Sequence, residues 1–271
     1  MSALRGGIVL ALGLLAAAPV ATQAQGVFGS VHTANLPTTR TPRAGAWLFE
    51  ISHRFDTPIS RGSEAFWGLD GPVFNRLGLA WAPRQGVMLG LLRSNFNDNL
   101  EVNGKVRGWS GGGDALRVEV AFAGGAAWNT EVFETAASGA RDNEFQGYAQ
   151  VIVNAAPGDR VALGLVPTWI RNPRIDDEGP ENGLALGVVG QLSLSRSVKV
   201  LAEWLATKAR EGLEHDPVSL GVGLETPGHT FRLLVTNQSR LNPTQFLGGS
   251  PTPFTPDEWR FGFNITRILP F

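Results

Sequence analysis

Apolar and polar residues alternate one by one along much of this chain. In residues 47–55 the odd positions are apolar or aromatic, whereas Glu50, Ser52 and Arg54 fall on the other face. The final stretch repeats this pattern, with Trp259, Phe261, Phe263 and Ile265 on one face and Arg260, Gly262, Asn264 and Thr266 on the other. Because successive strand side chains point to opposite faces, each segment is predicted to be a β-strand with one apolar and one polar face.

The same alternation recurs between these two segments. Leu116, Val118, Val120 and Phe122, for example, alternate with Arg117 and Glu119. Together with the two terminal strands, the pattern predicts about twelve strands. The ten between them are expected at about 75–83, 87–95, 100–108, 115–126, 144–154, 160–170, 184–195, 198–207, 217–225 and 229–238.

The predicted connections alternate between tight turns and long loops. Tight turns rich in Pro, Gly and Ser are expected at 83–86, 156–159, 195–197 and 226–228, and long loops at about 56–74, 127–143, 171–183, 208–216 and 239–258. If consecutive strands run up and down, every long loop lies at one end of the sheet and both termini at the other. This asymmetry is typical of outer-membrane barrels, which have short periplasmic turns and long extracellular loops. The predicted fold is therefore all-β: an antiparallel, up-and-down transmembrane β-barrel.

The N-terminus has the pattern of a secretory signal peptide. Arg5 supplies a positive charge, residues 8–20 form an apolar core, and Thr22-Gln23-Ala24 is a small-x-small cleavage site. We therefore expect a signal peptide at 1–24, a periplasmic lead segment at 25–46 and the barrel at 47–271. No later stretch approaches the ~18 consecutive apolar residues that a membrane-spanning helix needs.

Composition supports a membrane location over a soluble barrel or β-sandwich. Charged residues make up 17% of the chain, below the ~25% of soluble domains, and there is no Cys to staple the fold. Aromatic residues also gather at the ends of predicted strands, as an interfacial girdle requires. They are Trp47, Phe55, Trp81, Trp169, Trp204, Trp259 and Phe271. The net charge of −1, with no basic cluster, gives no support for a nucleic-acid partner.

Three stretches resemble an uncharacterised family of bacterial outer-membrane β-barrels, named only as a domain of unknown function. They are residues 49–55, residues 68–79 and the ending from Arg260 to Arg267. These motifs are structural, so the resemblance implies the fold and no catalytic residue. The terminal Phe271 resembles the C-terminal aromatic signal for barrel insertion, which implies contact with the barrel-assembly machinery and location in the outer membrane of a Gram-negative bacterium.

The polar strand faces are the strongest candidate site, because they should line the lumen. We expect charges of mixed sign there, which either pair into a plug or line a pathway for small solutes. Barrel closure should also bring Glu50 or Arg54 near Arg260. The candidate lumen residues are Glu50, Arg54, Arg117, Glu119, Lys199, Glu203, Arg232 and Arg260.

No catalytic, metal or cofactor site is predicted. The adjacent Ser52 and His53 point to opposite faces of a strand, so they cannot form a nucleophile–base pair. Three functions stay open: a structural or small-solute transport barrel in contact with outer-membrane lipid, a lipid-modifying barrel enzyme, and a scaffold for periplasmic or surface proteins. A triad whose members meet only in space would be invisible at this stage.

The first prediction concerns location. Because the chain combines a signal peptide with alternating strands, it should fractionate with outer membranes and migrate differently on a denaturing gel when it is not heated. Recovery as a soluble periplasmic monomer would contradict the membrane prediction.

Overall fold

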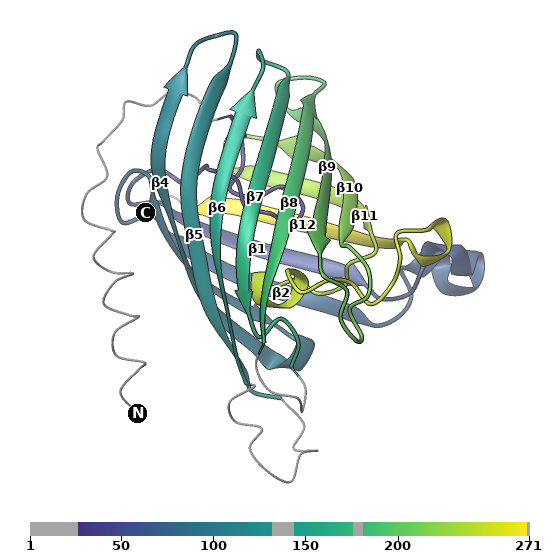
Figure 1. Ribbon diagram of the computed structural model, residues 1–271. Helices are drawn as coiled ribbons and strands as arrows, with labels where there is room; N and C mark the ends of the chain where they lie inside the picture. The colour runs from purple at the N-terminus through teal and green to yellow at the C-terminus, as the bar shows by residue number, and fades with distance from the viewer. Residues whose placement is uncertain (1–26, 132–143, 176–180, 270–271) are drawn as a thin grey trace, which may run out of the picture.

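The computed structural model describes residues 27–131, 144–175 and 181–269, and its main body is a closed β-barrel (Figure 1). Every strand pairs antiparallel with its sequence neighbours, and β1 pairs with β12 to close the ring. The predicted up-and-down barrel of twelve strands is therefore confirmed. The strands are β1 (Trp47–Phe55), β2 (Val73–Trp81), β3 (Val87–Ser94), β4 (Asn99–Gly112), β5 (Arg117–Asn129), β6 (Phe145–Ala156), β7 (Val161–Arg171), β8 (Asn182–Ser193), β9 (Val198–Thr207), β10 (Val218–Glu225), β11 (His229–Thr236) and β12 (Arg260–Leu269).

Helical structure is confined to the connections. Within the described residues, no helix is long and apolar enough to cross a bilayer. The short helical segments are η2 (Ile59–Gly68), η3 (Phe96–Asp98), α2 (Pro243–Phe246) and η5 (Pro256–Glu258).

Most strand boundaries agree with the sequence prediction to within a few residues. The exception is the end of β4, which extends beyond the predicted residue 108 to Gly112. Its register shifts between Arg107 and Trp109, which marks a β-bulge at Gly108. An extra residue moves the following side chains to the opposite face, so the apolar–polar alternation is interrupted there. This bulge explains why the strand's extension to Gly112 was missed.

Long and short connections separate as expected. The five long loops leave one end of the barrel, together with the short β3–β4 connection at 95–98, while the tight turns and both ends of the described chain lie at the other. We call these the long-loop end and the short-turn end.

The outer face of the barrel is apolar. On β7, buried residues alternate strictly with exposed ones, and the exposed set includes Leu163, Leu165 and Trp169. Aromatic side chains mark both ends of this face: Trp47 stacks on Trp81 at the short-turn end, and Trp128 stacks on Phe145 at the long-loop end. An apolar band between two aromatic girdles matches the lipid-facing surface of a membrane barrel. Phe271 and the segment 1–24 lie outside the described residues.

The cost of an arginine at two different depths tests whether this outer face contacts lipid. Leu165 is 48% exposed near the middle of β7, and Leu192 is 45% exposed at the short-turn end of β8. Leu165→Arg should lower the free energy of unfolding by about 2–4 kcal/mol, against about 0–1 kcal/mol for Leu192→Arg. Urea titration in lipid vesicles measures both. Equal costs would mean that the outer face does not cross the bilayer core.

Candidate functional site: a plugged lumen

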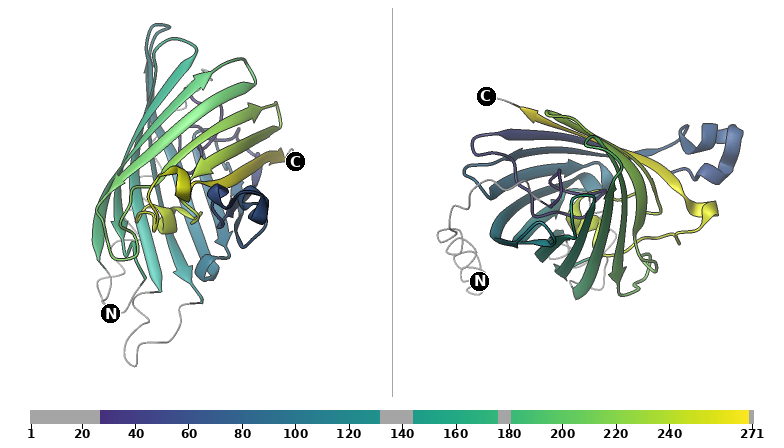
Figure 2. Two further views of the ribbon diagram at one scale, coloured as in Figure 1. Left: turned by 90° about the vertical axis from the view of Figure 1, so that its right-hand side faces the viewer. Right: turned by 90° about the horizontal axis from the view of Figure 1, so that it is seen from above.

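The segment that precedes β1 turns back into the barrel and occupies its interior. Residues 31–38 form a small hairpin: Thr38 N donates to Val31 O at 3.0 Å, and Thr33 N donates to Leu36 O at 2.9 Å. Most of residues 28–41 are buried, and Figure 2 (right) shows this segment inside the ring of strands. The sequence pattern predicts residues 25–46 only as a periplasmic lead and gives no sign that the chain enters the lumen. We call residues 27–41 the plug.

The tip of the plug is held by Glu203 of β9. One carboxylate oxygen, Oε2, accepts hydrogen bonds from the Thr33 hydroxyl and from the backbone N–H groups of Ala34, Asn35 and Leu36, at 2.8 to 3.1 Å. The other oxygen, Oε1, accepts from Asn35 Nδ2 at 2.6 Å. Successive N–H groups that converge on an anion form a concave binding site, which satisfies the buried charge and the buried turn together. We call this contact the Glu203 latch.

The opposite side of the tip is held where the barrel closes. Asn264 of β12 donates to Ala34 O at 2.6 Å, and Arg54 of β1 donates to Asn35 Oδ1 and Asn264 Oδ1 at 2.8 Å each. A Cβ atom at Gly262 would lie 2.7 Å from Arg54 Cδ, so only glycine leaves room for this arginine.

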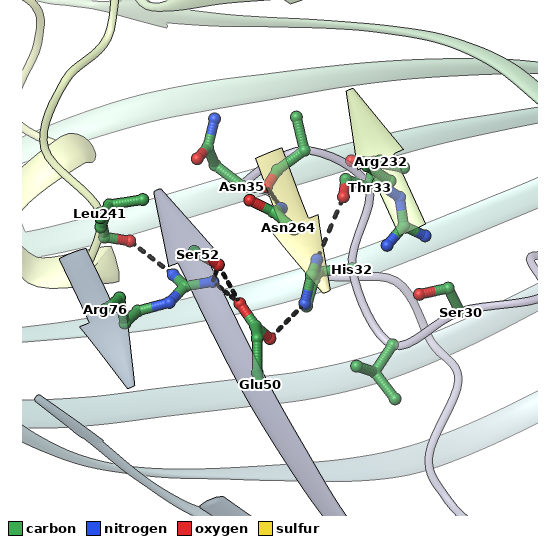
Figure 3. Close-up of polar contacts among 12 residues, drawn as sticks. Ser30, His32, Thr33, Asn35, Glu50, Ser52, Arg76, Arg232, Leu241 and Asn264 are labelled. Atoms are coloured by element: carbon green, nitrogen blue, oxygen red, sulfur yellow. Dashed lines mark hydrogen bonds and ion pairs between the residues drawn. The ribbon is translucent and has the colours of Figure 1, made fainter. Parts of the chain in front are cut away.

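Glu50 of β1 is the centre of a second cluster (Figure 3). Arg76 of β2 forms an ion pair with it, Ser52 donates to it at 2.6 Å, and His32 Nε2 of the plug lies 2.5 Å from its Oε2. The other ring nitrogen of His32 lies 3.1 Å from Thr33 O. Both ring nitrogens of His32 therefore lie beside oxygen atoms that can accept hydrogen bonds.

The base of the plug is tied to the wall by Lys105 of β4 and by Thr39. The Lys105 ammonium donates to Val31 O at 2.8 Å and to Thr38 O at 2.9 Å, which clasps the two arms of the hairpin. The Thr39 hydroxyl donates to Glu119 Oε2 at 2.5 Å, and its backbone N donates to Asn154 Oδ1 at 2.7 Å.

The β11–β12 loop fills the lumen from the long-loop end. Its helix α2 is buried, and Glu101 Oε2 of β4 accepts from the backbone N and the hydroxyl of Thr244 at 3.0 and 2.9 Å. Asn242 Nδ2 donates to Asn99 Oδ1 at 2.6 Å, and Arg76 donates to Leu241 O at 2.5 Å. Since Arg76 also pairs with Glu50, this arginine connects the loop to the plug.

One wall of the lumen is apolar, which the alternation of polar and apolar residues did not predict. Phe28 and Leu36 of the plug and Phe246 and Leu247 of the β11–β12 loop pack in one cluster against inward-facing residues of β6 to β9. A Cβ atom at Gly187 would lie 2.8 Å from Leu36 Cδ1, so glycine makes space for the plug there too. The plug and the β11–β12 loop therefore both combine apolar packing on one side with polar contacts on the other.

The structure places the eight candidate lumen residues as follows. Seven are buried, and Arg117 is half-buried at the start of β5. Glu50, Arg54, Glu119 and Glu203 contact the plug. Lys199 bonds to Ser193 and Ser195 at the short-turn end, Arg232 lies 4.0 Å from Glu225, and Arg260 pairs with Glu258 and approaches Asp56.

The partners of these charges differ from the pairing across the lumen that was one of the two alternatives. Glu50, Arg54 and Glu119 contact the plug, which lies between the walls. At the closure, Arg54 lies opposite Gly262, two residues from Arg260, and bonds to Asn264. Arg260 pairs with Glu258 and lies near Asp56 at the long-loop end.

Sequence reasoning missed four buried contributors: Arg76, Glu101, Lys105 and Tyr148. Arg76 lies on a strand face shared with Gly78 and Ala80, which does not read as polar, and the two β4 residues lie in the strand that the bulge obscured. Tyr148 donates to Glu101 at 3.2 Å.

The interior cluster does not have the geometry of a hydrolytic site. Ser52 donates to Glu50 and not to a histidine, and both nitrogens of His32 are engaged with acceptors, so no base is available to activate a nucleophile. His53 faces outward and stacks on Phe263 at 4.9 Å. Within the described ranges, no three His, Cys, Asp or Glu side chains are grouped as metal ligands would be.

Amide exchange tests the Glu203 latch. Glu203→Gln removes the charge and half of the acceptor capacity, and each hydrogen bond to a charged group contributes about 1.5–3 kcal/mol. Exchange at Ala34, Asn35 and Leu36 should therefore accelerate at least ~10-fold, while the barrel strands stay protected. Glu211→Gln, at a carboxylate whose side chain is 85% exposed, is the matched control. Unchanged exchange in Glu203→Gln would show that the latch does not hold the plug.

Comparisons with known proteins give a family and several distantly similar structures. Among solved structures, the NanC porin is similar at 9% identity (TM-score 0.48; 83% of this chain and 100% of that chain). The KdgM porin in complex with disordered oligogalacturonate is similar at 8% identity (TM-score 0.48; 81% and 98%), and LpxR from Salmonella typhimurium at 12% (TM-score 0.40; 82% and 99%). A search of curated protein sequences gives no match. Residues 28–269 match the family described as "Membrane bound beta barrel domain (DUF5777)", and the chain therefore belongs to this family of membrane-bound β-barrels.

Proposed function

We propose that the protein is an outer-membrane barrel of a Gram-negative bacterium that provides a small-solute pathway, closed at rest by its own plug and β11–β12 loop. The short-turn end would face the periplasm and the long-loop end the exterior, as in other outer-membrane barrels. On this proposal, outer-membrane lipid surrounds the apolar face and the barrel-assembly machinery inserts the chain.

The observation that carries the proposal is how the plug is held. Its polar side depends on a few charged wall residues, namely Glu203, Arg54, Glu50 and Lys105, and it belongs to a terminal segment that can withdraw without unpairing a strand of the barrel. A hollow beside Glu50 and Lys105 measures about 90 Å³. Ligand pockets usually measure about 300–1,000 Å³, so passage of a solute requires the plug to move.

Charge on the wall side of these contacts favours a plug that can be released. When the plug leaves, Glu203 and Lys105 regain water inside a wide polar lumen, which offsets part of the lost bonding. The apolar contacts of Phe28 and Leu36 oppose release, because their burial contributes about 1.5–3 kcal/mol for each side chain. The closed state is therefore the resting state, and opening is a minor population or needs a trigger.

A permanently closed barrel that presents its loops as a scaffold is the second candidate. The apolar cluster of Phe28, Leu36, Phe246 and Leu247 favours it, since such packing is typical of a fixed core. A lipid-modifying enzyme is not favoured, because the cluster of His32, Glu50 and Ser52 is buried inside the lumen and lacks a free base.

Planar-bilayer recordings separate the first two functions. The unmodified protein should conduct little, and Glu203→Gln combined with Arg54→Gln should raise the frequency and duration of openings, because both sides of the plug tip are then weakened. Glu64→Gln with Arg196→Gln, two exposed sites outside the plug contacts, is the control pair.

A reversible cross-link provides the second arm. The chain has no native Cys, and Asn35 Nδ2 lies 3.2 Å from Ser219 Oγ. Asn35→Cys with Ser219→Cys, joined by a short reducible bis-methanethiosulfonate, should abolish openings until reductant is added. A large steady current from the unmodified protein would contradict the presence of a plug. Silence from every variant, although amide exchange shows the plug loosened, would favour the scaffold.

A further inference from the structure

Arg240, in the β11–β12 loop, is a largely buried cation whose guanidinium lies over an aromatic ring. Its Cζ is 4.7 Å from the centroid of Phe96, and burial lowers the pKa of Arg240 to about 10, which leaves it charged at neutral pH. Among the described residues, no carboxylate lies within 4.0 Å of its guanidinium. A buried charge is normally paired, so this arrangement calls for a partner.

Other arginines at the long-loop end do have carboxylate partners. Their ion pairs are Arg93–Asp98, Arg174–Glu211, Arg210–Glu181 and Arg260–Glu258. Arg240 therefore differs from these arginines in having no carboxylate partner among the described residues.

The guanidinium of Arg240 lines a hollow of about 140 Å³ between the loops of the long-loop end. Arg174 and Glu211, which form an ion pair with each other, also line it. Gln245 lines it too: its Nε2 donates to Phe96 O at 2.7 Å, while its buried Oε1 has no hydrogen-bond partner among the described residues. A hollow with an unpaired cation and a free acceptor can hold an anion that also carries a hydroxyl or a protonated oxygen.

We infer that the long-loop end carries a binding site for a small oxyanion that also carries a protonated oxygen, such as hydrogen phosphate, centred on Arg240 and the acceptor Oε1 of Gln245. The inference rests on the proposed function for the role of the bound anion, which is that of a solute at the mouth of its pathway. The size of the hollow, below that of drug-sized ligand pockets, limits the ligand to a small molecule or to one charged group of a larger one.

Calorimetric titration of the full-length protein in detergent tests the site, with inorganic phosphate as the probe, acetate as an anion that has no protonated oxygen, and tetramethylammonium as the cation control. Saturable binding of phosphate should fall at least ~10-fold in Arg240→Gln, because charge-assisted hydrogen bonds are lost, and should fall less in Arg240→Lys, which keeps the charge without the fork geometry. Arg196→Gln, in the exposed β8–β9 turn, should bind as the unmodified protein does.

Three readouts separate the site from a structural role and from the proposed function. The thermal stability of Arg240→Gln without anion should match that of Arg196→Gln, and added phosphate should stabilise the unmodified protein more. If the titration shows binding but the variants of the Glu203 latch do not conduct, the binding site is supported and the transport proposal is overturned. Equal binding by Arg240→Gln and the unmodified protein, or the absence of saturable binding, would overturn the site even if the latch variants conduct. If lipopolysaccharide vesicles bind through Arg240 and free phosphate does not, the free-solute assignment is overturned.

Discussion

A buried carboxylate and a buried chain reversal satisfy each other inside this barrel. Glu203 needs hydrogen-bond donors because its charge lies away from water, and the tip of the plug needs acceptors because its backbone N–H groups have no strand partner. Neither group would be stable in the interior without the other. The closed lumen depends on this contact, since it fixes where the N-terminal segment turns and therefore which wall residues meet it.

The two walls of the lumen hold the plug and the β11–β12 loop by different kinds of interaction. The wall formed by β6 to β9 is apolar and packs against Phe28, Leu36 and Phe246, whereas the wall that includes β12, β1 and β2 supplies directional contacts through Asn264, Arg54 and Arg76. Apolar packing gives affinity without fixing orientation, and hydrogen bonds fix orientation with a smaller net contribution to stability. An interior of this kind can hold a segment in one position and still release it.

The sequence predicted the barrel well because alternation is a local property. Every expected strand was found, and the separation of long loops from tight turns was correct. Its failures have physical causes. The bulge at Gly108 interrupted the alternation, glycine and alanine beside Arg76 hid an inward face, and the turn Thr33–Leu36 has no pattern of its own that predicts burial. Pairing of charges across the lumen was a fair inference from the wall alone, but the plug, which comes from outside the strands, determines the actual partners.

Reactivity of a single thiol in the plug tests the central claim most directly. Ser30 is 7% exposed, its replacement by Cys is nearly isosteric, and the chain has no other Cys. With the folded protein in vesicles, a membrane-impermeant maleimide should modify Ser30→Cys at least ~100-fold more slowly than Ser63→Cys in the exposed β1–β2 loop, because the plug shields the thiol. Modification of both thiols at similar rates would show that the N-terminal segment does not occupy the lumen.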